Sequence, residues 1–445
     1  MAGRLLHHLL AAAPDHAEAL HLAGVLAHRG GRTEEAIALI ERALARGADP
    51  AVALRNLGEM CRLAGRMDEA LAAGRRAVAL APDDPAALHN LAFIHARRLE
   101  HDAALAVAGR LLALAPDHAG AHFTRAEVLL LRGNWAEGWE EYEWRFRTAG
   151  APPPIPPEHL RPVPGWDGQP LHHGRLLLVA DQGFGDVIQF ARYLPWAEAI
   201  CPAPILAGSP EVMPVLRQVA PRATLITRWA ELPPYAAHAT LSGLPRLHGT
   251  RPDTVPAPIP YLRSDPGRRA RWAARLAELV PPGLRRVGLV WAGRPTHRND
   301  GERSVDLDDL APLARLEGVA LLALQKGARV KHAGRYFGRA PLLNLGAEIA
   351  DYDDTMAVLD ELDLLVTVDT SVAHLAGAMG RPTWIMLPTA PDWRWLLGRG
   401  DTPWYPTARL FRRGVGQHWA EVASDIAGAV AGTAPPREIP SFPSP

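Results

Sequence analysis

An acidic residue follows a pair of glycines in the stretch LLLVADQGFGDVIQFARY, which runs from residue 176 to residue 193. An apolar run breaks at the Gly-Phe-Gly turn and resumes as an amphipathic helix, with Asp186 at its first position. Gly183 and Gly185 permit a sharp turn that brings the backbone close to a ligand. Asp186 is either a helix cap or a general base, because a carboxylate held at such a turn repels a phosphate but accepts a proton from a hydroxyl.

A nicotinamide cofactor is not indicated at this turn. The stretch DQGFGD lacks the third glycine of the dinucleotide fingerprint. An acid for the ribose would be expected about 20 residues later, where only Glu198 is available.

A second group with chemical potential ends the apolar run LLVTVD, at residues 364–369. Asp369 is placed to accept hydrogen bonds from sugar hydroxyls. Thr370 and Ser371 then begin a helix whose unpaired N–H groups and hydroxyls suit a diphosphate. His374 lies one turn into that helix and is either a donor-site residue or a buried structural histidine. No G-x-S-x-G elbow surrounds Ser371, which excludes a serine hydrolase of that type.

Cations gather after two further apolar runs. The loop after the run VGLVWAG, residues 287–293, carries Arg294, His297, Arg298 and Arg303, and Gln325 with Lys326 follows the run VALLAL. A charge run is often a solvated face, but cations at the ends of parallel strands suit a phosphate.

Aromatic side chains are the last candidates. Trp291 ends an apolar run, and Trp393 and Trp404 lie in the segment APDWRWLLGRGDTPWYP. They would either stack on a sugar or nucleobase or pack one sheet domain against another. The 19 histidines are scattered without metal-ligand spacing, so no metal site is predicted.

These residues must be positioned by alternating strands and helices. From residue 175 onward, short β-like runs alternate with helical segments, which indicates mostly parallel sheets. We expect an N-terminal Rossmann-like domain over residues 175–262 and a C-terminal one over residues 263–430. Ligands of such domains bind beyond the carboxyl ends of the strands.

The first 150 residues have a different organisation. Small residues recur every 34 positions at Gly24, Gly58, Ala92 and Ala126, and Pro-Asp steps fall on the same grid. This period is typical of tetratricopeptide repeats, an α-solenoid that binds an extended peptide or a partner helix, and a plain helical bundle is the alternative. The last unit, GNWAEGWEEYEWRF, is aromatic, as expected of a repeat that packs onto a neighbouring domain. Residues 151–174 read as a stiff Pro-rich linker, and residues 431–445 as a disordered tail.

Composition limits the binding partners and the cellular compartment that can be predicted. Forty-eight basic and 48 acidic side chains balance, so charge gives no case for nucleic acid or an anionic membrane. Two distant cysteines fit a reducing compartment. No apolar run approaches the roughly 18 to 20 residues of a membrane span. A cytoplasmic protein without a transmembrane segment is expected.

The segments GFGDVIQF, WAGRPTHRNDGERS, LQKG and DTSVAHLAGAMGRPTW resemble glycosyltransferase family 9, the ADP-heptose transferase family. The resemblance covers Arg175 to Val430 and is greatest to bacterial members that carry tetratricopeptide repeats. It implies the GT-B fold of two Rossmann-like domains and a reaction without metal. Repeats joined to such a transferase also resemble the architecture of O-linked N-acetylglucosamine transferase.

The resemblance also implies roles for individual residues. Asp186 corresponds to the catalytic base, and Arg303 stands nearest to the basic residue that contacts the diphosphate. The donor sugar and its diphosphate would be held by Asp369, Thr370, Ser371 and His374. The chain has Arg303 where the family usually has lysine, and its PDWRWLL segment also departs from the family. ADP-heptose is therefore not assigned as the donor.

The function expected is metal-independent, inverting transfer of a sugar from a nucleotide-diphosphate sugar to an acceptor hydroxyl. No cofactor is expected beside this co-substrate. The acceptor would be a protein such as a flagellin, presented by the repeats, or a lipid-linked or polysaccharide intermediate. Two alternatives are a non-catalytic repeat scaffold with a relic GT-B domain and a GT-B nucleotide-sugar epimerase.

Overall fold

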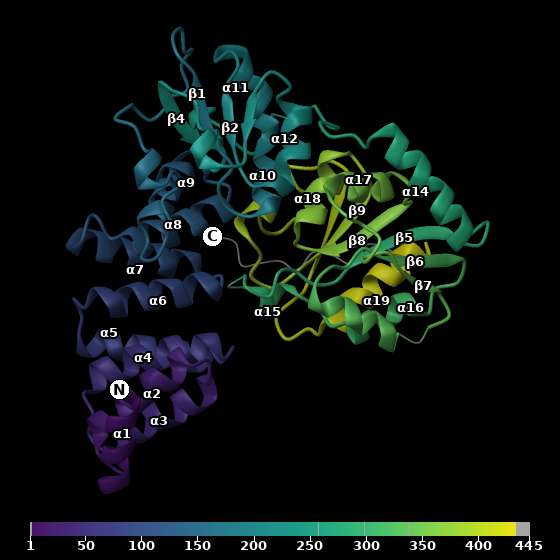
Figure 1. The fold of residues 1–445 in the computed structure, drawn as a ribbon. Coiled ribbons are helices and arrows are strands. Elements are labelled where there is room, and N and C mark those ends of the chain that lie inside the picture. Colours follow the sequence, from purple (N-terminus) through teal and green to yellow (C-terminus); the bar gives the residue numbers. More distant parts are fainter. Residues whose placement is uncertain (1, 257, 298, 337, 433–445) are drawn as a thin grey trace. The chain divides into compact units, whose positions relative to one another are not determined.

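The chain folds into two compact units. The computed structural model describes residues 2–256, 258–297, 299–336 and 338–432 (Figure 1). One unit includes the chain up to Leu130 and Glu140–Ala151, and the other includes Leu131–Trp139 and the chain from Pro152 onward. The tail predicted to be disordered lies, from residue 433, outside the described residues.

The first unit consists of paired helices, as the 34-residue period predicts. Its helices are α1 (Ala2–Ala12), α2 (Ala17–Arg29), α3 (Thr33–Ala45), α4 (Pro50–Leu63), α5 (Met67–Leu80), α6 (Pro85–Arg97), α7 (His101–Leu114) and α8 (Ala119–Leu131). A short helix, α9 (Trp135–Tyr142), follows them.

Small residues let the paired helices approach closely. A Cβ atom at Gly24 of α2 would lie 2.9 Å from Ile40 of α3. Helix starts are equally well specified: Asp49 and Asp84 accept hydrogen bonds from the first turns of α4 and α6, each of which begins with a proline. The repeat prediction is therefore confirmed in its helices and its close contacts.

The second unit contains two parallel sheets. The four-stranded sheet has the order β3-β2-β1-β4, with β1 (Leu176–Val179), β2 (Ile205–Ala207), β3 (Thr224–Ile226) and β4 (Ala237–Thr240). Its helices are α10 (Phe184–Phe190), α11 (Leu194–Ile200), α12 (Met213–Val219) and α13 (Leu244–Leu247). The sequence pattern indicated β1, β2 and β3 but not β4, whose residues Ala-His-Ala-Thr form no apolar run.

The six-stranded sheet has the order β10-β9-β8-β5-β6-β7. Its strands are β5 (Arg285–Val290), β6 (Val319–Ala323), β7 (Leu342–Asn344), β8 (Leu364–Val368), β9 (Thr383–Leu387) and β10 (Ala408–Arg412). Its helices are α14 (Pro266–Leu279), α15 (Asp300–Arg303), α16 (Ala311–Ala314), α17 (Tyr352–Asp360), α18 (Ser371–Ala378) and α19 (Trp419–Val430). In Figure 1, α16 and α19 lie on one side of this sheet, and α17 and α18 on the other.

Residues 151–174, predicted as a stiff Pro-rich linker, also contribute side chains to the core of the four-stranded sheet. Ile155 is buried in the core of the first sheet beside Leu177 and Ile205. Trp166 is also buried, and its N–H donates to the carbonyl of His238 in β4 at 2.7 Å. Within residues 151–174 the prolines permit one short 3-10 turn, Pro157–His159, and the apolar side chains of Ile155 and Trp166 between them are buried.

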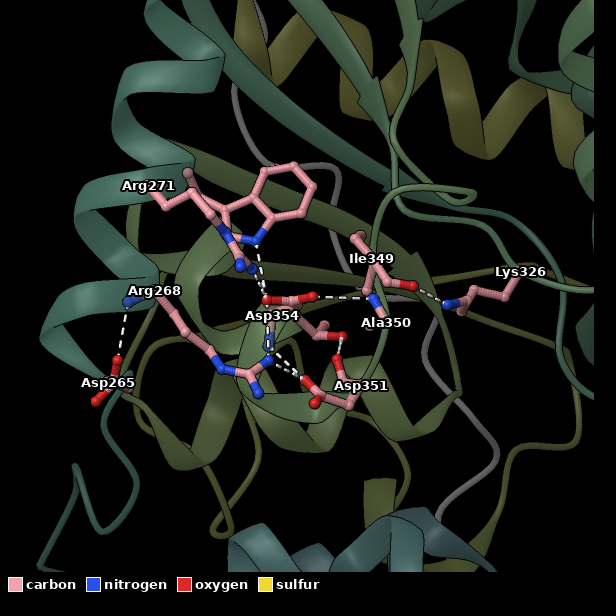
Figure 2. A network of polar contacts seen from close by, with 10 residues as sticks. Asp265, Arg268, Arg271, Lys326, Ile349, Ala350, Asp351 and Asp354 are labelled. Carbon is pink, nitrogen blue, oxygen red and sulfur yellow. Dashed lines mark hydrogen bonds and ion pairs between the residues drawn. The ribbon is translucent and has the colours of Figure 1, made fainter.

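Helix α14 is tied to α17 by a buried carboxylate (Figure 2). Asp354 is 2% exposed and accepts hydrogen bonds from Arg268 at 3.0 Å, from the indole of Trp272 at 3.2 Å, and from Arg271. Its second oxygen accepts from the N–H of Ala350 at 3.0 Å. This network, which the sequence did not reveal, holds α14 to α17 beside the six-stranded sheet.

No helix among the described residues combines the length and the apolar character needed to cross a membrane.

Candidate active site

Asp186 lies in the first turn of α10, directly after β1. The helix begins at Phe184 and Gly183 is its N-cap, so Asp186 is the third helical residue rather than the first. Its Oδ2 accepts the N–H of Gly183 at 3.1 Å. A capping role therefore exists, but it uses only one of the two carboxylate oxygens.

The turn before α10 is built differently from the prediction. Gln182, with φ of 70°, adopts the left-handed conformation there, whereas Gly183 has φ of −79°. Asp181 accepts the N–H of Ser242 at 3.1 Å and also its hydroxyl, which anchors the turn to the end of β4. Neither glycine is needed for a left-handed turn.

Gly185 allows two helices from different sheets to touch. A Cβ atom at this position would lie 2.8 Å from Cδ2 of His374 and 3.5 Å from Cα of Ser371. Such a distance is shorter than carbon atoms tolerate, so only glycine fits. The contact brings α10, which carries Asp186, next to the start of α18.

Arg394 is the main partner of Asp186, and the sequence analysis did not identify it. Its Nη2 donates to Asp186 Oδ1 at 2.5 Å, and its Nε donates to Oε1 of Gln189 at 2.8 Å. Its Nη1 lies 2.7 Å from Oδ1 of Asp392. An arginine between two tryptophans in PDWRWLL was the available signal, since a charged group amid aromatics needs an acidic partner.

Asp369 and His374 lie at the end of β8 and in α18. Both are buried, and His374 Nε2 is 3.8 Å from Asp369 Oδ1. Nδ1 of His374 is hydrogen-bonded to the hydroxyl of Tyr405 at 2.9 Å, and its ring stacks on Trp395 with centroids 5.4 Å apart. His374 is thus a buried histidine with structural partners that also borders the candidate site.

Thr370 is the N-cap of α18 and Ser371 is its first residue. The hydroxyl of Thr370 makes no capping bond and lies 3.2 Å from that of Thr367. The first N–H groups of α18 therefore receive no cap from this side chain, which is compatible with the predicted anion site.

Arg303 is a further cation near this group, since its charge acts on the pKa values of both Asp369 and His374. Its guanidinium packs over Gly293, where a Cβ atom would lie 2.6 Å from Nη2. Its Nε is buried and has no hydrogen-bond partner among the described residues. Arg294 lies over the ring of Phe184 at 5.2 Å, whereas Arg298 lies outside the described residues.

Gln325 and Lys326 have structural contacts. Gln325 is buried, and its Oε1 accepts the N–H groups of Trp291 and Ala292 at 3.0 and 2.9 Å. Its Nε2 donates to the carbonyls of Ala292 and Lys326. The amide joins the ends of β5 and β6 and has no hydrogen left for a nucleotide. Lys326 donates to the carbonyl of Ile349 (Figure 2).

The three candidate stacking residues are buried. Trp291 belongs to the core of the second sheet. Trp404 stacks on Trp135 with centroids 5.0 Å apart, and Trp393 meets Trp139 edge-on at 5.2 Å. Trp135 and Trp139 of the last predicted repeat thus pack with the sheet domains, whereas Trp144 of the same segment stacks on His122. Trp404 also meets Phe190 of α10 edge-on with ring centroids 6.4 Å apart, so it packs one sheet domain against the other, which is one of the two predicted alternatives.

Burial and charge perturb the ionisation of the site. Burial raises the pKa of Asp186, and the Arg394 guanidinium opposes that rise. Burial likewise raises the pKa of Asp369, against the effect of the same arginine. Burial, together with Arg394 and nearby arginines, lowers the pKa of His374 well below its ordinary value. The histidine is therefore neutral near pH 7, and the acids are better proton acceptors than exposed ones.

No three His, Cys, Asp or Glu side chains come together as metal ligands in the described part of the chain.

Comparison with known proteins identifies the repeats. The profile described as "Tetratricopeptide repeat" matches residues 2–52 and 29–85. The chain therefore contains tetratricopeptide repeats. Protein FlbA of Caulobacter vibrioides (strain ATCC 19089 / CIP 103742 / CB 15) is 31% identical over 316 residues, covering 65% of this chain and 51% of FlbA. The chain spans about half the length of this curated relative.

Several solved structures resemble about a third of the chain. MamA is 22% identical over 32% of this chain and 82% of its own, with a TM-score of 0.29. YrrB, described as a TPR protein with an unusual peptide-binding site, is 22% identical over 32% of this chain and 74% of its own, with a TM-score of 0.29. PilF of Pseudomonas aeruginosa is 20% identical over 34% of this chain and 68% of its own, with a TM-score of 0.30.

Proposed function

We propose that the chain is an inverting, metal-independent glycosyltransferase of the GT-B type that moves a sugar from a nucleotide-diphosphate sugar to an acceptor hydroxyl. The observation that carries this proposal is the meeting of Asp186 with the Asp369–His374 segment across Gly185. Asp186, whose pKa is raised by burial, follows a strand of the four-stranded sheet. The start of α18, which lies near Arg303, follows a strand of the six-stranded sheet. Group transfer needs a base and a leaving-group site that face each other.

In the proposed reaction, Asp186 accepts the proton of the acceptor hydroxyl. The hydroxyl oxygen forms a bond to the anomeric carbon from the face opposite the diphosphate. The bond from that carbon to the diphosphate oxygen breaks, and the diphosphate leaves with the electron pair. Arg303 and the N–H groups at the start of α18 stabilise its charge. Because one displacement occurs, the anomeric configuration inverts.

The repeats would supply the acceptor. Tetratricopeptide repeats bind extended peptides or partner helices, so we infer that the acceptor is carried by a polypeptide. A lipid-linked or polysaccharide acceptor would leave the repeats free for another partner.

One observation favours a second candidate, a scaffold without catalysis. Both oxygens of Asp186 already accept hydrogen bonds within the chain, one from Arg394 and one from Gly183. Gln325 is similarly saturated. A relic domain held together by such contacts would keep its fold without turning over a substrate.

Ligand binding separates the two candidates. A panel of nucleoside diphosphates and nucleotide sugars should raise the midpoint of thermal unfolding with one nucleobase, equally with and without magnesium. At 100 times its dissociation constant, a ligand adds about 2.7 kcal/mol of stability. Absence of any shift would favour the scaffold.

A substitution then tests catalysis. Asp186→Asn should preserve the nucleotide-induced shift, because asparagine still accepts the N–H of Gly183. Transfer or donor hydrolysis should fall by about 10²–10⁴-fold, the contribution of a general base. Equal activity of the two proteins would contradict the role of Asp186.

A further inference from the structure

Arg394 links an acid of the first sheet domain to a loop of the second. It belongs to a short 3-10 turn, Trp393–Trp395, between β9 and β10. From there its guanidinium reaches Asp186 and Gln189, which lie three residues apart on one face of α10. Arg394 is 9% exposed in its side chain, and Asp186 is 19% exposed. A charge-assisted contact at this burial is short and directional.

The position of Arg394 is itself well determined. Asp392 caps the turn by accepting the N–H of Arg394 at 3.1 Å, and it also contacts the guanidinium. The indole of Trp393 lies 4.7 Å from Cζ of Arg394. Trp393 in turn packs edge-on against Trp139. The guanidinium therefore has its polar directions and one face occupied before any ligand arrives.

We propose that Arg394 is the positioning residue of the base: it holds Oδ1 of Asp186 so that the remaining lone pair of Oδ2 receives the proton of the acceptor hydroxyl. This inference rests on the proposed function of Asp186. Gln189 supports the same arrangement, because its Oε1 accepts a hydrogen bond from Nε of Arg394. Its own Nε2 is buried and has no hydrogen-bond partner among the described residues.

Two charges on the same turn act on Asp186 in opposite directions. Burial raises the pKa of the Asp186 carboxyl most strongly, Arg394 opposes that rise, and Asp392 adds to it. Other charged or titratable groups around α10 are His374 in α18, Asp369 directly before α18, Arg192 and Tyr193 directly after α10, and Glu211 in the 3-10 turn before α12. Arg294 and Tyr352 contact Phe184 of α10, and the charge of Arg303 acts on Asp369 and His374.

The test compares substitutions within this one segment. The readout is hydrolysis of the nucleotide sugar selected by the binding panel, in which water replaces the acceptor, measured from pH 6 to pH 9. Arg394→Gln should be most impaired at pH 6, and its activity relative to the unchanged protein should rise at least about tenfold by pH 9. Asp392→Asn should shift the acidic side of the pH–activity profile toward lower pH, because the charge of Asp392 raises the pKa of Asp186. Arg394→Lys should retain the pH profile of the unchanged protein in part, because lysine keeps the positive charge but lacks the planar, fork-shaped set of N–H donors of arginine.

Arg399→Gln is the matched control. Arg399 lies in the same loop and pairs with Asp401 rather than with Asp186. Its substitution should leave the pH profile unaltered. A merely structural role of Arg394 would lower activity by one factor at all pH values, and that outcome would overturn the proposal.

A second measurement does not depend on activity. Unfolding of the unchanged protein, Asp186→Asn, Arg394→Gln and the double variant forms a mutant cycle. Non-additive effects would support the contact, and additive effects would overturn it. If the unchanged protein hydrolyses no nucleotide sugar while the cycle is non-additive, the proposed function fails and the Asp186–Arg394 contact stands. If hydrolysis occurs with unshifted profiles, only the role of Arg394 fails.

Discussion

At the residue scale, the sequence indicated the acid of the candidate site but not its partner. Asp186 was visible because an acid next to glycines at the end of an apolar run is conspicuous. Arg394 lies 208 positions away and contacts Asp186 only because α10 and the loop between β9 and β10 converge. The roles of Gln325 and Trp291 were equally hidden, since burial in a sheet core cannot be distinguished from exposure at a strand end by spacing alone.

Asp354 illustrates how a buried acid fixes local stability. Although burial alone would raise its pKa, the Ala350 N–H, the Trp272 indole and Arg268 together hold the pKa below its ordinary value. Asp354→Asn should reduce the free energy of unfolding by about 2 kcal/mol or more, because charge-assisted hydrogen bonds are lost. Because the folded pKa is depressed, this stability is present above the unfolded pKa and is lost as pH falls through the folded value.

Chemical denaturation at pH 7 and at pH 3.5 measures this effect. The difference between Asp354→Asn and the unchanged protein should shrink at the lower pH. Asp253→Asn is the control, since Asp253 is 77% exposed in its side chain and should contribute less than about 1 kcal/mol. A pH-independent difference would contradict the assignment.

At the element scale, the interior strands were predictable, whereas three edge strands, β4, β7 and β10, were not. Continuous apolar runs marked β1, β5, β6, β8 and β9, because parallel strands covered on both faces are apolar throughout. β7 and β10 are sheet edges with partly exposed residues, so their patterns are weak. The sequence found the strands that carry the candidate site, since those are interior.

The approach of α10 to α18 gives a prediction for a single methyl group. Gly185→Ala would place Cβ 2.8 Å from Cδ2 of His374, so one helix must move. We expect a loss of about 1–3 kcal/mol in unfolding free energy, as for overpacked cores. Gly301→Ala, in α15, meets nothing within 4 Å and should be neutral or stabilising. Thermal unfolding of the Gly185→Ala and Gly301→Ala variants tests this difference, and equal midpoints would contradict the close contact between α10 and α18.

At the scale of the whole molecule, the border between the two units passes through α9. Leu131–Trp139 belongs with the sheets, whereas Glu140–Ala151 belongs with the repeats. Trp139 donates its indole N–H to the carbonyl of Thr250 at 2.9 Å, and Trp144 stacks on His122 with centroids 3.9 Å apart. Two tryptophans five residues apart thus stabilise different units.

Hydrogen exchange on the full chain tests this division. Trp139→Ala should reduce protection around Thr250 and in the loop that carries Trp393, and Trp144→Ala should reduce it in α8. Trp139 is buried, so its replacement should lower the free energy of unfolding by about 3–5 kcal/mol. Trp144 is only half-buried, so a smaller loss is expected for it. Loss of protection throughout both units in either variant would contradict the assignment of α9.

The sequence by itself determined the helical repeats, the alternating strands and the acid at the end of β1. These depend on periodicity, apolar runs and turn residues, which act over a few neighbouring positions. Only the tertiary structure decided which groups meet that acid: Arg394, Gln189 and the start of α18 arrive from distant segments. It also decided that Trp135, Trp139, Ile155 and Trp166 are buried in cores, whereas the prolines near Ile155 and Trp166 are not. Contacts between side chains so far apart in the sequence depend on how sheets and helices pack, and a local sequence pattern does not determine that packing.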